Sequence, residues 1–346
     1  MSCASAPAGA AEAFDCPHRA SVVFESCWQR RSTGACPRRA GDTVVCMQER
    51  ENAVPRLPSP VEELADDRVA SAGVRLFLKR DDLIHPDLPG NKWRKLKYNL
   101  RAAGDRGYGT LLTFGGAYSN HIRAVAAAGR IFGFSTIGVV RGEEHHPLNP
   151  SLTYAADRGM RLVYMDRRTY RRKHDPDVVA DLHRRFGEFW LLPEGGSNEL
   201  AVRGCAELPA ELDFAFDVVC CPCGTGGTLA GVAAGLAPGQ RALGFSALKG
   251  GQFLADDVAR LQLQTYGKVF GNWSIEYDFH FGGFAKSTAE LQDFIADFNA
   301  RHGVLLDWVY VGKMMYGILA LTRQGQFPPG TKVVAVITGP AWPGEV

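Results

Sequence analysis

The sequence predicts an α/β protein, and three features carry this prediction. From Pro55 onward, short runs of β-branched and aliphatic residues alternate with alanine-rich stretches of helical periodicity, which is typical of parallel strands joined by helices. The chain has 346 residues, of which 46 % are hydrophobic and 22 % charged, so it can form about two domains with ample cores. Internal repeats and low-complexity blocks are absent.

The expected strands and helices alternate along the chain. The runs predict strands at residues 74–78, 110–114, 136–140, 161–164, 189–192, 218–221, 243–246 and 333–337. Helices are expected at residues 91–105, 121–132, 177–186, 229–236, 288–302 and 314–323. Residues 1–53 show no sustained period, so we expect a disordered N-terminal extension there.

Charge and cysteine placement limit the classes of partner. The 39 basic and 37 acidic side chains leave a net charge of +2, which does not favour nucleic acid as a partner, and no window approaches the ~18 apolar residues of a membrane helix. Five of the nine cysteines lie within the first 50 residues without a Cys-x2-Cys spacing, so we favour disorder over zinc there and expect no metal. No secretory signal is recognisable, which favours a reducing cytoplasm.

A glycine-rich stretch follows the strand expected at residues 218–221. The stretch Gly224-Thr-Gly-Gly-Thr228 also opens a helix, where backbone N–H groups and the positive helix end can converge on an anion. It lacks the lysine of the Walker pattern and the glycine spacing of the dinucleotide fingerprint. We expect a phosphate-binding loop, and the alternative is a plain strand-to-helix turn.

A cluster of lysines begins the helix expected at residues 91–105. Lys92 and Lys95 share one helix face, so at most one of them need point into a cleft. A lysine beside a phosphate-binding loop suggests an amine that forms an imine with an aldehyde cofactor, because its surroundings can remove its charge. For Arg94 and Lys97 we prefer a solvated basic helix start.

A third motif, Gly115-Gly-Ala-Tyr-Ser-Asn-His121, lies between an expected strand and an alanine-rich helix. Ser119, Asn120 and the first N–H groups of the helix can form a second anion pocket, suited to a substrate carboxylate. Taken alone, Ser-Asn at this place is more often a helix cap. His121 has no Asp or Cys partner spaced for a catalytic triad or a metal site.

In combination, the motifs resemble the fold-type-II pyridoxal-phosphate enzymes, in particular the 1-aminocyclopropane-1-carboxylate deaminase and D-cysteine desulfhydrase family. The resemblance runs from about residue 57 to residue 339 and implies two open twisted-sheet lobes of the tryptophan synthase β-like kind. It implies a large cofactor-binding lobe at residues 54–105 and 205–346 and a small lobe at residues 106–204. The matching stretches are Lys79-Arg-Asp-Asp82, Gly90-Asn-Lys-Trp-Arg-Lys95, Ser119-Asn-His121, Glu194-Gly-Gly-Ser-Asn198, Gly224-Thr-Gly-Gly-Thr228 and Val309-Tyr-Val-Gly-Lys313.

The same resemblance implies pyridoxal 5'-phosphate as cofactor and a role for each matching residue. It makes Lys92 the Schiff-base lysine. Ser119 would lie beside the substrate carboxylate and help move protons, and Tyr310 would lie close to the reacting carbon as a general acid, base or orienter. Asn120 would bond the cofactor's 3-hydroxyl, and Thr338 the pyridine nitrogen. The phosphate would be bound by Gly224, Thr225, Gly226, Gly227 and Thr228, and the substrate by Ser119, Asn120 and His121.

Departures from the family pattern concern the substrate. The deaminase branch carries a carboxylate directly after the motif tyrosine, where this chain has Val311, and His121 follows the desulfhydrase branch. The segment 279–286, which usually offers a second tyrosine, has no phenol at the matching place, and Tyr277 lies nearby. The chain also reads Gly339-Pro340 where relatives carry two glycines.

The resemblance and its departures together imply a deaminating lyase like D-cysteine desulfhydrase. It would act by α,β-elimination on a small β-substituted amino acid and give a 2-oxo acid and ammonia. Four alternatives stay open: a 1-aminocyclopropane-1-carboxylate deaminase, an amino-acid racemase, a β-replacement enzyme and a catalytically weak cofactor-binding protein. The expected partner is a small amino acid, with no nucleic acid or membrane, and a homodimer stays open.

Overall fold

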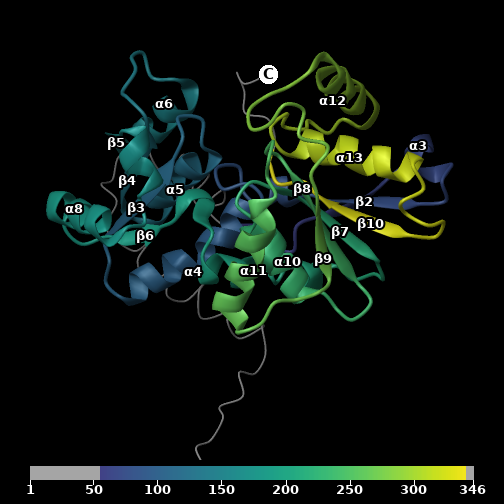
Figure 1. Ribbon diagram of the computed structural model, residues 1–346, viewed down its shortest axis with the longest axis horizontal. Coiled ribbons are helices and arrows are strands. Elements are labelled where there is room, and N and C mark those ends of the chain that lie inside the picture. The colour runs from purple at the N-terminus through teal and green to yellow at the C-terminus, as the bar shows by residue number, and fades with distance from the viewer. Residues whose placement is uncertain (1–54, 340–346) are drawn as a thin grey trace, which may run out of the picture. The chain divides into compact units, whose positions relative to one another are not determined.

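The computed structural model describes residues 55–339, which form two β-sheets flanked by helices (Figure 1). In the described chain, the first sheet has six strands in the order β1-β2-β10-β7-β8-β9, and the second has four in the order β5-β4-β3-β6. The strands are β1 (Val61–Leu64), β2 (Arg75–Lys79), β3 (Thr110–Gly115), β4 (Ser135–Arg141), β5 (Arg161–Met165), β6 (Trp190–Leu192), β7 (Val218–Cys223), β8 (Arg241–Ser246), β9 (Trp273–Glu276) and β10 (Lys332–Val336).

Neighbouring strands pair in parallel, except for β1, which pairs antiparallel to β2 at the edge of the first sheet. In the centre of that sheet, Val334 of β10 lies opposite Phe77 of β2 and Val219 of β7. Every residue of β7 is buried. Continuous apolar runs of this kind are typical of parallel strands that are covered on both faces.

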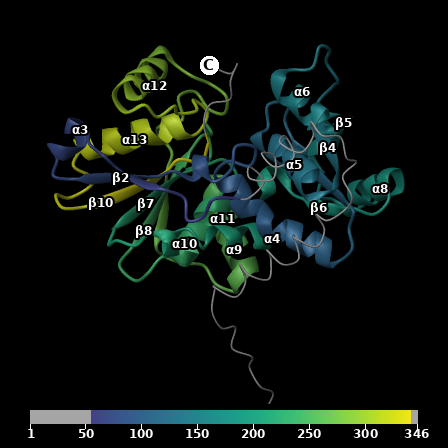
Figure 2. The same ribbon diagram turned by 180° about the vertical axis from the view of Figure 1, so that it is seen from behind.

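Helices cover both faces of the first sheet, as Figures 1 and 2 show. One face packs against α13 and α12, and the other against α9, α10 and α11. Successive side chains of β7 alternate between these two cores, because the side chains of a strand point to opposite faces in turn. The helices are α3 (Asp67–Ala70), α4 (Asn91–Asp105), α5 (Asn120–Phe132), α6 (Pro150–Asp157), α7 (Arg167–Arg171), α8 (Pro176–Phe186), α9 (Glu199–Cys205), α10 (Gly227–Gly235), α11 (Phe253–Tyr266), α12 (Ala289–His302) and α13 (Val311–Arg323).

The eight predicted strands and six predicted helices are confirmed, with shifts at their ends. The predictions missed the edge strands β1 and β9 and the helices α3, α6, α7, α9 and α11. Both missed strands lie at a sheet edge, have four residues and are at most half-buried, so they lack the long apolar run that marks a central strand.

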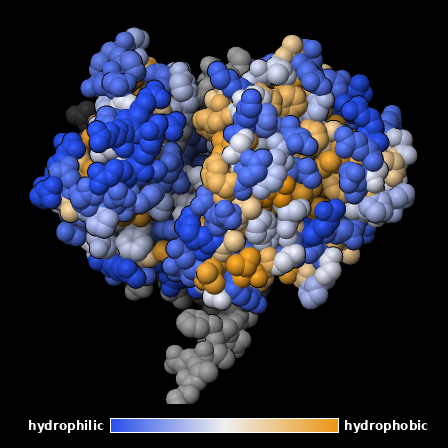
Figure 3. All heavy atoms as spheres, viewed as in Figure 1, coloured by the Kyte–Doolittle hydropathy of each residue, from blue (hydrophilic) through white to orange (hydrophobic). Residues whose placement is uncertain are grey.

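The strands of each sheet fall within one of the ranges predicted for two lobes, and the exact lobe boundaries stay a prediction. In the space-filling view the surface is hollowed between the parts built on the two sheets (Figure 3). The N-terminal extension expected at residues 1–53, with its five cysteines, lies outside the described residues. Between residues 55 and 339, no helix is long and apolar enough to cross a membrane.

Candidate active site

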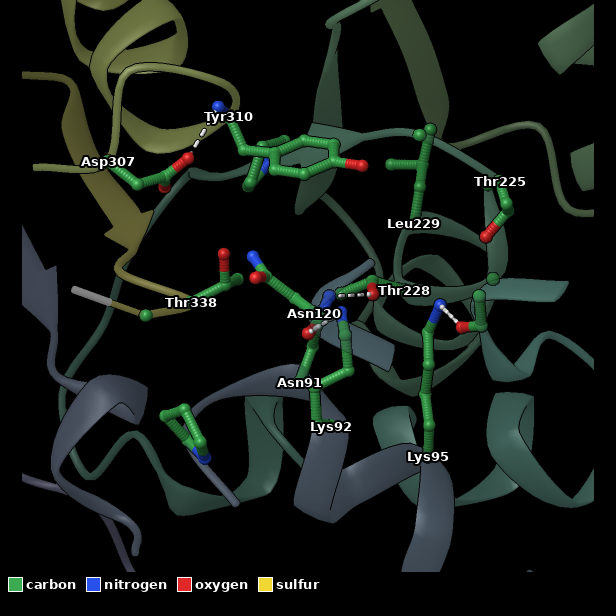
Figure 4. A pocket seen from close by; sticks show the side chains of 17 residues that line it. Asn91, Lys92, Lys95, Asn120, Thr225, Thr228, Leu229, Asp307, Tyr310 and Thr338 are labelled. Carbon is green, nitrogen blue, oxygen red and sulfur yellow. Dashed lines mark hydrogen bonds between the residues drawn. The ribbon is translucent and has the colours of Figure 1, made fainter. Parts of the chain in front are cut away.

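A pocket of about 750 Å³, part of it open to solvent, lies where several helices begin. Its lining comes from the starts of α4, α5, α10 and α13 and from the segments that follow β7 and β10 (Figure 4). Because the carboxyl ends of parallel strands and the amino ends of the following helices meet at one edge of a sheet, this edge is where α/β folds bind ligands. The pocket therefore lies where the fold class predicts a site.

The start of α4 is held against the end of β10 by a glycine. Gly90 has a φ of 61°, and a Cβ atom there would lie 1.8 Å from the carbonyl oxygen of Thr338, so no other residue fits. The next two side chains, Asn91 and Lys92, both line the pocket. Lys92 Nζ donates to Asn91 Oδ1 at 2.9 Å, and Asn91 Nδ2 donates to Thr228 Oγ1 at 3.0 Å. The lysine is thus tied to the glycine-rich loop through Asn91.

The pocket favours the neutral form of the Lys92 amine. Removal from water, together with the nearby charge of Lys95, lowers the pKa of Lys92 from 10.5 to about 7. About half of the amine is then unprotonated at neutral pH, and the unprotonated amine is the form that attacks an aldehyde. This property matches the imine-forming role that the resemblance implies for Lys92.

The glycine-rich loop ends in the uncapped start of α10. Gly226 has a φ of 72°, and no side chain caps the helix that begins at Gly227. A Cβ atom on Gly227 would lie 2.4 Å from Ser197 Oγ, so the loop packs directly on the segment 195–197. Ser197 Oγ and Thr225 Oγ1 lie 2.7 Å apart and share a hydrogen bond. The first N–H groups of α10 are therefore free of side-chain caps and can bind an anion.

Both Lys92 and Lys95 line the pocket, although the sequence predicted that only one of them need do so. Lys95 Nζ donates to the carbonyl oxygen of Gly195 and to Ser197 Oγ, each at 3.0 Å. An ammonium group has three N–H donors, so one remains for an anion bound at the start of α10. Both lysines reach the pocket because it extends along about one turn of α4.

The predicted solvation of Arg94 and Lys97 is wrong. The Arg94 side chain is fully buried and makes two hydrogen bonds to each of two carboxylates, those of Asp81 and Glu211. Lys97 pairs with Glu207, and its side chain is 12 % exposed. Because α4 packs against α9 and α5, much of its surface away from the pocket is buried as well.

The opposite wall of the pocket is formed by the start of α13. A Cβ atom on Gly224 would lie only 3.0 Å from the Tyr310 ring, so the phenol rests on the glycine-rich loop. Phe284 packs against the same ring with its centroid 6.0 Å away. Burial and the nearby Asp307 raise the pKa of Tyr310 well above its usual range, so its hydroxyl stays protonated at neutral pH. Tyr310 can therefore donate a hydrogen bond into the pocket.

Asp307 also lines the pocket, and the sequence reasoning missed it. Its carboxylate accepts hydrogen bonds from the backbone N–H groups of Val309, Tyr310 and Val311. Burial raises its pKa from 3.8 to about 6, although these three bonds act in the opposite direction. The available signal was an aspartate just before a helix start.

Not all predicted site residues line this pocket. Asn120 and Thr338 do, whereas Ser119, His121 and Tyr277 are not among the lining residues of the described chain. The Ser119 hydroxyl caps α5 by accepting from the N–H of Ile122 at 3.3 Å, which is the role that Ser-Asn has most often. His121 is 2 % exposed, and burial with the charges of Lys92 and Lys95 lowers its pKa well below the usual range. Substrate binding by Ser119 and His121 stays a prediction.

The pocket fits pyridoxal phosphate at both of its ends. At one end, Lys95 and Thr225 surround the uncapped start of α10, which suits a phosphate (Figure 4). At the other end, Thr338 offers a hydroxyl that suits a pyridine nitrogen, and the Lys92 amine lies between the two ends (Figure 4). A cofactor with a phosphate, an aldehyde and a ring nitrogen finds a matching group for each.

Two proteins with established names are similar to this chain in sequence. A protein of Pyrococcus furiosus named "Putative 1-aminocyclopropane-1-carboxylate deaminase" is 32 % identical over 77 % of this chain and 85 % of its own length. An Arabidopsis thaliana protein named bifunctional D-cysteine desulfhydrase/1-aminocyclopropane-1-carboxylate deaminase, mitochondrial, is 28 % identical over 77 % of this chain and 72 % of its own.

A solved structure and a family model also match this chain. The crystal structure of an ACC deaminase homologue matches with a TM-score of 0.72 and 28 % identity, covering 83 % of this chain and 92 % of that chain. The predicted fold class is thereby confirmed. The family model described as pyridoxal-phosphate dependent enzyme matches residues 56–339. The chain therefore belongs to the family of pyridoxal-phosphate dependent enzymes.

Proposed function

We propose that the protein is a deaminating lyase that eliminates the β-substituent of a small amino acid and releases a 2-oxo acid and ammonia. The observation that carries the proposal is the shared pocket of Lys92, the loop 224–228, Tyr310 and Thr338. A lobe organisation of 54–105 with 205–346 and of 106–204, a homodimer and a cytoplasmic location are parts of the same proposal.

Each pocket residue has a role that follows from its chemistry. Bound pyridoxal phosphate supplies an electron sink for the negative charge that develops at the α-carbon of an amino acid. Lys92 Nζ, with a pKa of about 7, can take up and return a proton at neutral pH. Tyr310 keeps its hydroxyl proton and can donate a hydrogen bond to a departing group. Lys95 and the start of α10 would hold the phosphate and so fix the position of the cofactor.

The groups near Thr338 favour elimination over the opening of a cyclopropane ring. Val311 is fully buried in the core beneath α13 and offers no carboxylate to the pocket. Among the described residues, Asp307 is the acid that lines the pocket, and both of its oxygens already accept backbone N–H groups. A hydroxyl such as that of Thr338 can bond a neutral ring nitrogen but cannot hold a positive charge there. The cofactor ring then withdraws negative charge less strongly. Elimination of a good leaving group from the β-carbon requires less of this stabilisation than the opening of a cyclopropane ring.

A second candidate, 1-aminocyclopropane-1-carboxylate deamination, is favoured by the printed names of the relatives from Pyrococcus furiosus and Arabidopsis thaliana. Because the Arabidopsis name includes both activities, the names do not separate the two candidates. The absence of an acid at position 311 is the observation that favours elimination.

A substrate panel tests the proposal. The purified holoprotein is incubated with D- and L-cysteine, β-chloro-D- and β-chloro-L-alanine and 1-aminocyclopropane-1-carboxylate, and the 2-oxo acid and ammonia released are measured. We expect pyruvate from D-cysteine or β-chloro-D-alanine and no product above background from the cyclopropane. The Lys92→Ala variant, which lacks the amine, should release none.

Three results would contradict the proposal. Turnover of the cyclopropane at a rate comparable to that of β-chloroalanine would make the protein a cyclopropane deaminase. Exchange of the α-proton in D₂O without 2-oxo acid would indicate a racemase. Bound cofactor without exchange or product would indicate a binding protein.

A further inference from the structure

Asp307 is the acidic side chain among the described residues that line the pocket, and the chemistry proposed above leaves it without a role. It is 9 % exposed. Its Oδ1 accepts the N–H groups of Val309 at 3.1 Å and of Tyr310 at 2.7 Å, and its Oδ2 accepts that of Val311 at 3.0 Å. Its own carbonyl oxygen accepts the N–H of Gly312 at 2.7 Å. Four consecutive N–H groups at the start of α13 thus bond to one residue.

These bonds fix the backbone of Tyr310 from both sides. Its N–H is held by Asp307 Oδ1, and its carbonyl oxygen accepts the N–H of Met314 at 3.1 Å. With both peptide groups held, the direction of the side chain is set at Cα. The ring then lies against Gly224, where a Cβ atom would come within 3.0 Å of it. The contact with the glycine-rich loop therefore depends on how the start of α13 is held.

A neutral side chain at position 307 would not hold the start of α13 in the same way. Asn149, Asn198 and Thr288 each cap a helix of this protein by accepting one N–H group. Asp307 accepts three, which requires the lone pairs of two oxygens, and the positive end of α13 favours its negative charge. This choice has a cost, because burial disfavours the ionised carboxylate. Natural proteins tolerate such costs mainly where function requires them.

The charged and titratable groups that influence Asp307 come from two elements. Lys92 of α4 lies across the pocket, and its charge and that of Asp307 favour each other. Lys313 of α13 is buried, and Asp307 favours its charged form; Asp307 also favours the protonated phenol of Tyr310. The charge of the carboxylate therefore acts both on the amine and on the phenol to which the proposed function assigns roles.

We propose that Asp307 is a positioning residue of the active site, whose carboxylate holds the start of α13 and thereby keeps the Tyr310 phenol against Gly224 and inside the pocket. This inference rests on the proposed function, in which the Tyr310 hydroxyl donates a hydrogen bond to the departing group. It assigns to Asp307 no contact with substrate or cofactor.

A double-mutant cycle tests the inference. In Asp307→Asn, one oxygen can still accept two N–H groups, but the amide NH₂ faces the N–H of Val311 and the charge is lost. We expect kcat on the best substrate of the panel to fall roughly 10- to 100-fold, as for a misplaced catalytic group, while KM changes less than about threefold. In a Tyr310→Phe background the same substitution should lower kcat less than about twofold, because its effect passes through the phenol.

The control is Asp166→Asn. Asp166 is exposed and does not line the pocket, and it caps the helix α7 by accepting two N–H groups, at 2.9 and 3.0 Å. This variant loses a comparable cap and should keep the wild-type kcat. An equal loss of kcat in this control, or an Asp307→Asn effect that is the same with and without the Tyr310 hydroxyl, would overturn the inference.

Amide hydrogen exchange gives a readout that does not require turnover. Peptides that span residues 309–311 should exchange faster in Asp307→Asn, with cofactor content and melting temperature close to those of the wild type. Faster exchange with an unchanged kcat would refute the positioning role, as would unchanged exchange. A wild type that releases no 2-oxo acid would refute the proposed function, while faster exchange at residues 309–311 would still support the anchoring of Tyr310.

Discussion

Replacement of Arg94 by methionine should destabilise the protein strongly, because Arg94 balances buried charge. Its guanidinium donates to Asp81, which is fully buried, and to Glu211, each through two hydrogen bonds. Lys79 supplies the second positive charge, 2.7 Å from Glu211. Two cations thus face two carboxylates, and methionine would leave one buried negative charge unpaired.

Breaking a buried pair in this way costs about 3–5 kcal/mol. At about 2–4 °C per kcal/mol for a domain of this size, the melting temperature should fall by roughly 6–20 °C. The loss should depend on pH. Although burial alone would raise it, the bonds from Arg94 and Lys79 lower the pKa of Glu211 from 4.5 to about 2. Its contribution to stability is present above pH 4.5 and is lost as the pH falls toward 2, so wild type and variant should converge in acid.

Urea unfolding of the holoprotein and the apoprotein measures the effect, and two further variants test its cause. In Arg94→Met/Asp81→Asn the buried charge is again balanced, so the double variant should be more stable than Arg94→Met. Arg172→Met removes an exposed arginine that also bonds two carboxylates, and it should cost less than about 1 kcal/mol. A loss below 1 kcal/mol in Arg94→Met, or additive losses in the double variant, would refute the charge-balance argument.

The other predictions concern the two lysines of the pocket. The rate at which apoprotein binds pyridoxal phosphate covalently at Lys92 should rise with pH through about 7, because only the neutral amine reacts and its pKa is lowered to about 7; stopped-flow absorbance would measure it, and a midpoint above pH 9 would contradict the lowered pKa. Lys95→Met should weaken cofactor binding roughly 10- to 100-fold through loss of a charge-assisted hydrogen bond to the phosphate, measured by titration of apoprotein. Lys97→Met, whose lysine pairs with Glu207 outside the pocket, is the control, and an equal loss there would count against the role of Lys95.

Local sequence signals were sufficient for the elements whose environment is uniform along their length. The predicted helix at residues 91–105 has the same bounds as α4, and the central strand β7 follows from an apolar run that is buried on both faces. The edge strand β1 could not be predicted in this way, since its central residues Glu62 and Glu63 are exposed and it pairs with one neighbour only.

The predicted site shows the same division between local and long-range information. The start of α4, the loop before α10 and the end of β10 each carry a local motif, and the structure brings Lys92, Gly224 and Thr338 into one pocket. The burial of Arg94 depends instead on a partner 117 residues away, Glu211, which no local pattern identifies. Asp307 enters the pocket because α13 starts there, which is likewise a property of the assembled fold.

Which substrate the pocket suits depends more on the hydrogen bonds that its charged groups already make than on which charged groups are present. Within residues 55–339, two amines and one carboxylate line the pocket, which by count alone would allow the carboxylate to hold a proton on the cofactor's ring nitrogen. Asp307 lies toward the same end of the pocket as Thr338 (Figure 4), so its position alone would not exclude this. Its two oxygens, however, accept the N–H groups of Val309, Tyr310 and Val311, and turning the carboxylate toward the ring would release the backbone of Tyr310. A carboxylate held in this orientation by the start of α13 is not free to turn toward the ring nitrogen. The ring nitrogen is then left with the neutral hydroxyl of Thr338, and that arrangement suits an amino acid whose β-substituent leaves readily.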